Sequence, residues 1–310
     1  MGSNRDWVNQ AVGDPDEATK ASSMPRITTG KILSLALPSL GALIAEPLFT
    51  VIDSTMVGHL GTPQLAGLGV SSTVLNTAVG LFIFLAYSTT SLAGRHLGAG
   101  RRDLAIRSGV EAMWLAGALG ACAAILLAVF ASPLLTWLGA DAATMPHALA
   151  YLRFSAPGLV GMFVVLAATG TLRGLQDTRT PLVAASVGAA FNAVANWALM
   201  YPLGMGVAGS GLGTAITQTL MALFLSAMIV RAARREGVSL KPSTSGFFAS
   251  AAEGTPLLIR TLALRVALLA TLTAVTSIST QALAAHQIVW TLWSFAAYVL
   301  DALAIAAQAL

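Results

Sequence analysis

Eight long apolar stretches constrain this chain more than any other feature of its sequence. Of its 310 residues, 56% are hydrophobic and only 10% are charged, and a helix that crosses a bilayer needs about 20 mostly apolar residues. The stretches cover residues 32–57, 68–92, 110–135, 148–172, 181–201, 209–230, 256–278 and 283–310. Because a backbone in lipid must satisfy its own hydrogen bonds, we expect each stretch to form a helix. The sequence therefore predicts an all-α, polytopic membrane protein.

Lysine and arginine residues fall in alternate connections between these stretches. Only Arg153, Arg260 and Arg265 lie elsewhere, so the other fourteen of the seventeen basic residues are on one side. The positive-inside rule makes that side cytoplasmic. We therefore expect an integral protein of the plasma (cytoplasmic) membrane with a cytoplasmic N-terminus, and a disordered cytoplasmic tail at 1–30. Nucleic acid is not an expected partner, because the basic residues do not share one face.

The last two spans repeat the sequence pattern of the first two, so the repeating unit has six spans. A shift of 218 positions places Pro38 on Pro256 and Thr62 on Thr280, and it aligns the first two spans with the last two. Because six is even, the copies share one orientation, as in one type of transporter repeat. We expect a complete N-terminal six-helix lobe at 31–231 and a cytoplasmic inter-lobe linker at 232–255. Residues 256–310 would then be the first two helices of a second, parallel-repeat lobe.

Asp53 lies inside the first span, within FTVIDSTMVGHLG. An aspartate at the centre of a span costs about 2.5–3.5 kcal/mol on insertion scales, so an acid there indicates function. The alternative is an acid close enough to the interface to reach water. At about 1.5 Å per residue, Asp53, Asn196 and Thr214 have a similar depth below the outer surface. Asn192 shares a helix face with Asn196. These polar groups could form a cation site, or only hold the helices together.

Several segments in order resemble the multidrug and toxic compound extrusion (MATE) transporters. They are PSLGALIAEPLFTVIDSTMVGHLGTPQLAGLGV, SLAGRHLGAGRRDLA and GTLRGLQDTRTPL, and TQALAAHQIVWTLWSFAAYVLDALA resembles the DinF-like branch. The resemblance implies twelve helices in two lobes, of which this chain has about eight. It also implies secondary active efflux of organic, cationic or amphipathic compounds in exchange for protons by alternating access. Na⁺ is the alternative coupling ion, and the full-length protein is expected to be monomeric.

The same resemblance assigns site residues. It implies that Asp53, Asn192 and Thr214 bind the coupling cation. Asn196, also in this group, occupies the position where the family pattern often has a second aspartate. This departure argues against a proton relay between two carboxylates and weakens a Na⁺ site by one charge. Tyr151 matches a cavity tyrosine of the family, although a tyrosine of the membrane interface is an equal interpretation.

Pro47 and Glu46 precede Asp53 in the same span. Proline removes a backbone donor and clashes with the preceding turn, so we expect a kink at Pro47. That kink would be a hinge that bends when Asp53 changes charge, or a static bend. Glu46 lies two turns before Asp53 on roughly the same face. It is a candidate contact for a cationic substrate, or a buried protonated acid.

Charged residues also occur in the last two spans. Asp301 and Arg265 each lie about nine residues from the inner end of their span, and Arg260 lies nearer the cytoplasm. Because isolated charges inside a membrane are costly, we expect an intramembrane ion pair of Asp301 with Arg265 or Arg260. The pair is expected to be structural, since a guanidinium beside an acid keeps it ionised.

Patterns of catalysis and metal binding are missing from the sequence. It contains neither HExxH nor GxSxG, and its single Cys122 cannot form a disulfide framework or a cysteine metal cluster. We therefore expect no enzyme activity, no cofactor and no metal, with small organic substrates and membrane lipids as partners. The alternative function is a flippase for lipid-linked saccharides or lipids in the same wider superfamily, which would need a strongly basic cavity.

Overall fold

The computed structural model describes residues 29–242, 244–276 and 280–309, and every element within these ranges is a helix. The elements are α3 (Thr29–Gly58), α4 (Thr62–Leu81), α5 (Phe84–Gly98), α6 (Arg102–Trp137), α7 (Met145–Ser155), α8 (Gly158–Gly174), α9 (Arg179–Met200), α10 (Val207–Arg235), α11 (Thr244–Thr276) and α12 (Thr280–Ala309). The predicted tail at 1–30 lies outside the described residues, except for the two that begin α3.

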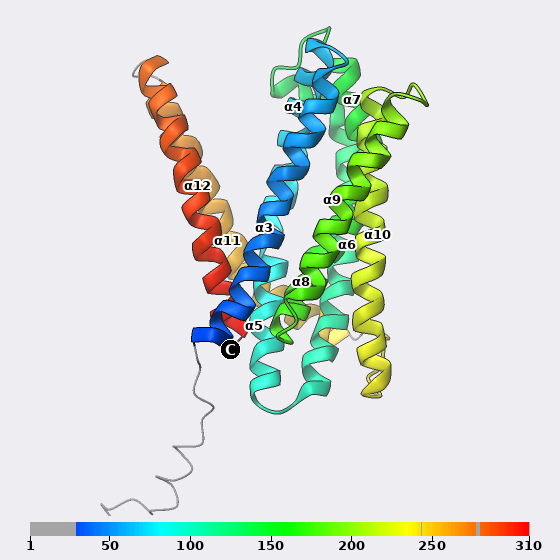
Figure 1. Cartoon of the computed structure of the whole chain (residues 1–310), viewed down its shortest axis with the longest axis vertical. Coiled ribbons are helices and arrows are strands. Elements are labelled where there is room, and N and C mark those ends of the chain that lie inside the picture. Colours follow the sequence, from blue (N-terminus) through cyan, green and yellow to red (C-terminus); the bar gives the residue numbers. More distant parts are fainter. Residues whose placement is uncertain (1–28, 243, 277–279, 310) are drawn as a thin grey trace, which may run out of the picture.

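Helices α3 to α10 form one bundle, and α11 and α12 lie on one side of it (Figure 1). Within the bundle, α8 packs against α5, α6 and α10, and α9 packs against α3 and α10. Helix α12 contacts α3, α5 and α8. This arrangement confirms the predicted fold class, a helical bundle with a complete first lobe and two helices of a second.

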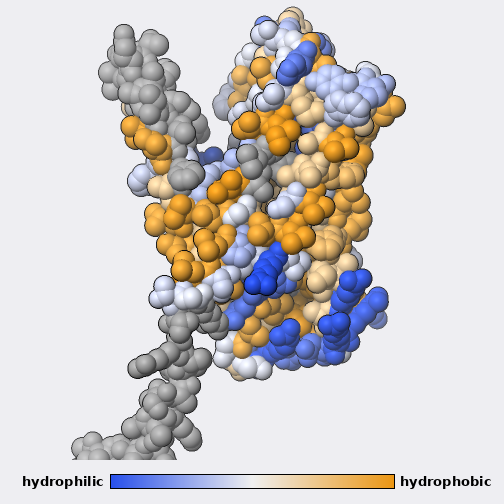
Figure 2. Space-filling view, in the orientation of Figure 1, coloured by the Kyte–Doolittle hydropathy of each residue, from blue (hydrophilic) through white to orange (hydrophobic). Residues whose placement is uncertain are grey.

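The helices have the length and composition of membrane spans. In the described ranges, five helical stretches are long and apolar enough to cross a bilayer, one of them α4 and α5 together and one Leu292–Ala309 of α12. The pair α7–α8 adds a sixth if it counts as one span. That pair bends by 53° because Pro157, at the junction, has no N–H to continue the hydrogen bonds of α7. Figure 2 shows many hydrophobic residues across the visible face of the bundle and strongly hydrophilic residues at its lower end.

The range 232–255, expected to be the inter-lobe linker, contains helical turns at both of its ends. Helix α10 continues to Arg235 and α11 begins at Thr244, because both flanking segments are rich in alanine, the strongest helix former. The connection is tied to α6, since Arg107 Nη1 donates a hydrogen bond to the carbonyl oxygen of Ser239 at 2.7 Å.

The two lobes meet at the end where the chain enters α3 and leaves α12, which we call the inner end. Leu35 and Ala36 of α3 form a small core there with Ala306 and Ala309 of α12. Gln176 Nε2 also donates a hydrogen bond to the carbonyl oxygen of Ala309 at 3.0 Å. Toward the opposite, outer end, α11 and α12 diverge from the bundle (Figure 1). The described parts of α11 and α12 therefore contact the bundle at its inner end and diverge from it toward its outer end.

Helix α3 stays one helix across both Pro38 and Pro47. The hinge at Pro47 is therefore not a break in the helix, and its bending stays a prediction. The side chain of Glu46 lies outside the described part of the structure.

Candidate functional site

Asp53 lies near the outer end of α3 and is only 8% exposed. Its carboxylate accepts two hydrogen bonds at the same oxygen, Oδ1: Ser210 Oγ donates at 2.5 Å and Asn196 Nδ2 donates at 3.1 Å. The ion pairs of the described residues do not include Asp53. Within the described ranges, this buried acid is therefore held by neutral donors from α9 and α10.

Asn192 and Asn196 extend this network along α9. The two amides face each other, and Asn196 Nδ2 donates to Asn192 Oδ1 at 3.2 Å. Asn192 Nδ2 in turn donates to Thr217 Oγ1 of α10 at 3.4 Å. All three side chains are at least 98% buried. The structure thus brings Asp53, Asn192 and Asn196 together, whereas the depth argument named Asp53, Asn196 and Thr214.

A glycine allows α9 and α10 to approach at this network. A Cβ atom added at Gly213 would overlap Asn196 Oδ1 and lie 3.3 Å from the Asn196 backbone nitrogen. Ser210 and Thr217 lie on the same face of α10 as Gly213, one turn to either side. The absent side chain at Gly213 therefore lets the hydroxyls of Ser210 and Thr217 reach the network that contains Asp53.

Thr214 and Tyr151 lie in the same cavity as Asp53 but, in the part of the chain that the structure describes, do not donate hydrogen bonds to its carboxylate. Tyr151 is 4% exposed, and its phenol interacts with the hydroxyls of Thr214 and Ser72 and with the charge of Asp53. Among the hydrogen bonds of the described residues, Thr214 reaches Tyr151 and not Asp53. Both residues line the same cavity as Asp53, so the structure groups them with the site without direct contact.

Sequence reasoning missed Ser210 and Thr217. Both belong to the polar face of α10 that also carries Thr214, at intervals of four and three residues. Extending that face by one turn in each direction from Thr214 would have found them.

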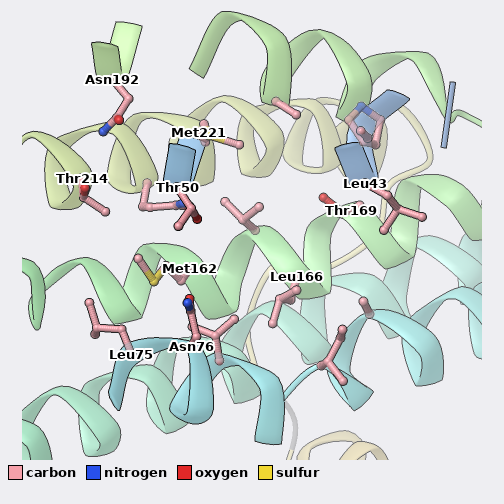
Figure 3. A pocket seen from close by; sticks show the side chains of 18 of the residues that line it. Leu43, Thr50, Leu75, Asn76, Met162, Leu166, Thr169, Asn192, Thr214 and Met221 are labelled. Carbon is pink, nitrogen blue, oxygen red and sulfur yellow. The ribbon is translucent and has the colours of Figure 1, made fainter. Parts of the chain in front are cut away.

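The site opens into a cavity of about 230 Å³ inside the N-terminal lobe. Figure 3 shows Asn192 and Thr214 toward one end of it and Leu43 and Thr169 toward the other. Helix α8 lines the cavity along its length, with side chains one turn apart. These residues are Met162, Val165, Leu166, Thr169 and Arg173. The cavity therefore has the acid near its outer end and an apolar wall along α8.

The expected ion pair of the last two spans is not formed among the described residues, which include all three partners. Neither Arg260 nor Arg265 comes within ion-pair distance of Asp301. The carboxyl of Asp301 interacts instead with the phenol of Tyr87 and with the charge of Arg173. The reason is packing: α12 lies against α5 and α8, which carry Tyr87 and Arg173.

Comparison with known proteins identifies relatives of this chain. The MatE family model matches residues 38–198. "Protein DETOXIFICATION 44, chloroplastic" of Arabidopsis thaliana is 33% identical over 296 residues, which cover 90% of this chain and 56% of that protein. "DNA damage-inducible protein F" of Escherichia coli (strain K12) is 30% identical over 283 residues, covering 89% of this chain and 61% of that protein. The chain spans less than two thirds of the length of these relatives.

Solved structures share the fold. A MATE structure in the bent conformation superposes with a TM-score of 0.81 at 22% identity, covering 90% of this chain and 64% of that one. An outward-facing multidrug resistance MATE transporter superposes with a TM-score of 0.77 at 21% identity, covering 90% and 64%. These findings confirm the resemblance drawn from the sequence. Members of this family are transporters rather than enzymes. Because the family model covers more than half of the 310 residues, the chain belongs to the MatE family of membrane transporters.

Proposed function

We propose that this chain carries the coupling site of a secondary active transporter that exports organic cationic or amphipathic compounds in exchange for protons. One observation carries the proposal: Asp53 is a buried carboxylate with only neutral partners among the described residues, and it lines a cavity inside a membrane bundle. The transporter would lie in the plasma membrane with a cytoplasmic N-terminus, so the inner end of the structure would face the cytoplasm.

The chemistry of the proposal is competition for one negative charge. An ionised carboxylate in a low-dielectric site is costly unless a positive charge neutralises it. A proton or a cationic substrate can each neutralise Asp53, but one carboxylate does not need both. Binding of one therefore disfavours binding of the other, and this opposition is what couples two gradients.

Alternating access would use this competition in a defined order. The lobes meet at the inner end and diverge at the outer end, which supports a conformation that receives protons from outside. A proton from outside neutralises Asp53 and displaces the substrate. Release of the proton to the cytoplasm then resets the acid. Bending of α3 at Pro47 would link the two states, with Asn192, Asn196 and Thr214 shaping the site.

The hydrogen-bond pattern favours a proton over Na⁺. Ser210 and Asn196 both direct hydrogens at Asp53 Oδ1, whereas a hard cation needs oxygen ligands directed at it. Asn196 also leaves the site with one acid rather than two. The cavity wall contains one acid and one arginine among its described residues. This balance supports export of organic compounds over the flippase alternative, which would need a strongly basic cavity.

A transport assay tests the proposal. The full-length protein is reconstituted in liposomes, and efflux of the cation tetraphenylphosphonium is measured under an imposed pH gradient, with and without Na⁺. We expect a pH gradient alone to drive efflux, Asp53→Asn to abolish it, and Asp103→Asn, at an exposed acid of α6, to leave it unchanged. Efflux by Asp53→Asn at the wild-type rate would refute the coupling role. Efflux driven only by Na⁺ would refute proton exchange.

A further inference from the structure

Arg173 is a buried cation with an unused hydrogen-bond donor. It lies in the last turn of α8, it is 7% exposed, and it lines the cavity. Its Nε atom is buried without a hydrogen-bond partner, one of only two such side-chain atoms in the described part of the chain. Leaving a buried charged donor unpaired is costly, and natural structures rarely keep such a group without a reason.

The neighbours of Arg173 balance its charge only in part. Tyr87 lines the same cavity, and its phenol interacts electrostatically with the guanidinium. Asp301 of α12 also acts on Arg173, but the two do not form an ion pair within 4.0 Å among the described residues. A guanidinium offers five N–H donors in a planar fork that matches a carboxylate or a similar oxyanion. Such a group on a ligand would meet donors that Asp301 leaves unused.

The position of Arg173 gives the cavity two chemically different ends. Met162, Leu166, Thr169 and Arg173 follow one another at helical spacing along the cavity face of α8. From Met162 to Arg173 the helix rises by roughly 16 Å. Met162 lies at the end of the cavity near Thr214 (Figure 3), and Thr214 belongs to the outer site. The cavity thus runs from a carboxylate near its outer end, past an apolar wall, to a guanidinium at its inner end.

We propose that Arg173 forms an anion-binding subsite of this cavity. The ligand class is an amphipathic organic compound with a carboxylate or sulfonate group. The oxyanion binds the guanidinium of Arg173, and the apolar body lies along Met162, Leu166 and Thr169. A ligand that also carries a cationic group places it toward Asp53. The subsite rests on the transport cavity of the proposed function and defines a substrate class for it.

Two matched dyes test the subsite. The anionic probe is 8-anilinonaphthalene-1-sulfonate, and the neutral probe is N-phenyl-1-naphthylamine, which has the same rings without the sulfonate. Dissociation constants are measured by fluorescence with the protein in nanodiscs, after subtraction of empty nanodiscs. We expect Arg173→Gln to weaken sulfonate binding roughly 10- to 100-fold and to change binding of the neutral dye less than about twofold. Arg173→Lys should retain part of the sulfonate affinity, and Asp301→Asn should increase it.

Equal sulfonate affinity of wild type and Arg173→Gln would overturn the subsite. Equal loss of both dyes would mean that the cavity had collapsed, and the wild-type protein then decides the question. Phenylglyoxal modification of Arg173, followed by mass spectrometry, should be slowed by the sulfonate dye and not by the neutral dye. Modification at the same rate with both dyes would refute the proposal.

A variant of the coupling acid separates this inference from the proposed function. Asp53→Asn should abolish tetraphenylphosphonium efflux, and adding Arg173→Gln to that variant should still weaken sulfonate binding roughly 10- to 100-fold. If efflux survives Asp53→Asn and sulfonate binding still depends on Arg173, the coupling mechanism fails and the subsite stands. If Asp53→Asn abolishes efflux and Arg173→Gln does not change the sulfonate affinity, the subsite is refuted and the coupling mechanism stands.

Discussion

Helices α3 and α11 occupy equivalent positions in the sequence repeat but carry different chemistry at their matching sites. Asp53 of α3 corresponds to Thr271 of α11 at the 218-residue shift. Asp53 is buried and bound by side chains of two other helices. Thr271 is exposed within the described part of the chain, and its hydroxyl donates to Ala267 of its own helix at 2.9 Å.

The difference shows that the repeat reproduces spans and orientation but not the site. Helix α3 contacts α9 and α10, which supply the amides and hydroxyls around Asp53, whereas α11 contacts α4, α5, α6 and α12. An acid inside a membrane acts through the groups that surround it. The coupling site therefore depends on neighbours from α9 and α10, and the fold alone does not define it.

Moving the acid to the equivalent helix is the strongest test of this difference. We expect the double variant Asp53→Asn/Thr271→Asp to stay inactive, with pH-driven efflux reduced by roughly a hundredfold or more. The cause is that an acid at position 271 finds neither Asn196 nor Ser210. Thr271→Asp alone is the control and should retain efflux. Recovery of efflux in the double variant would show that any acid at this depth suffices.

The second test concerns the close packing of α9 against α10 at Gly213. Gly213→Ala would push a methyl group into Asn196, and we expect it to lower the free energy of unfolding by about 1–3 kcal/mol. Gly69→Ala is the matched control, since a Cβ there meets nothing within 4 Å. Its stability should be unchanged or slightly higher. Thermal unfolding in detergent measures both, and equal stability of the two variants would contradict the packing argument.

Ser210 gives a smaller, chemical test of the same site. Ser210→Ala removes the 2.5 Å hydrogen bond to Asp53 Oδ1, which stabilises the ionised acid. We expect tetraphenylphosphonium to bind roughly five- to tenfold more weakly. Thr219→Val is the control, because Thr219 donates to Ala215 of its own helix. Isothermal titration calorimetry compares the two, and equal affinities would place Ser210 outside the coupling site.

The smallest expected effect is on the pH dependence of unfolding and comes from Asp141. This solvent-exposed acid serves as a comparison for the buried Asp53. It lies in the exposed connection before α7, where hydrogen bonds from the side chain and backbone of Thr144 hold the pKa of Asp141 below its usual value. A lowered pKa in the folded state adds stability above the pKa of the unfolded chain, and this stability is lost as pH falls through the folded pKa. Unfolding measured against pH should show a slight acid-side loss that Asp141→Asn removes. An unchanged pH profile in Asp141→Asn would contradict this.

Hydropathy, charge alternation and helical spacing were sufficient to predict the bundle and to bring Asp53, Asn192 and Asn196 together. They could not predict the bend at Pro157, since proline also occurs within the continuous α3. They missed Ser210 and Thr217 because hydroxyls are common on packing faces. The sequence patterns led to a predicted ion pair of Asp301 with an arginine of α11, because sequence does not reveal which face of α12 meets α5 and α8. Inter-helix contacts of this kind depend on tertiary packing that local patterns do not encode.

The central claim is that a proton and a cationic substrate compete for Asp53. Tetraphenylphosphonium is added to the purified protein in weakly buffered detergent, and proton release is followed with a pH indicator across acidic to neutral pH. We expect release of up to about one proton for each cation bound, and no release from Asp53→Asn. Cation binding by the wild-type protein without proton release at any pH tested would contradict the account.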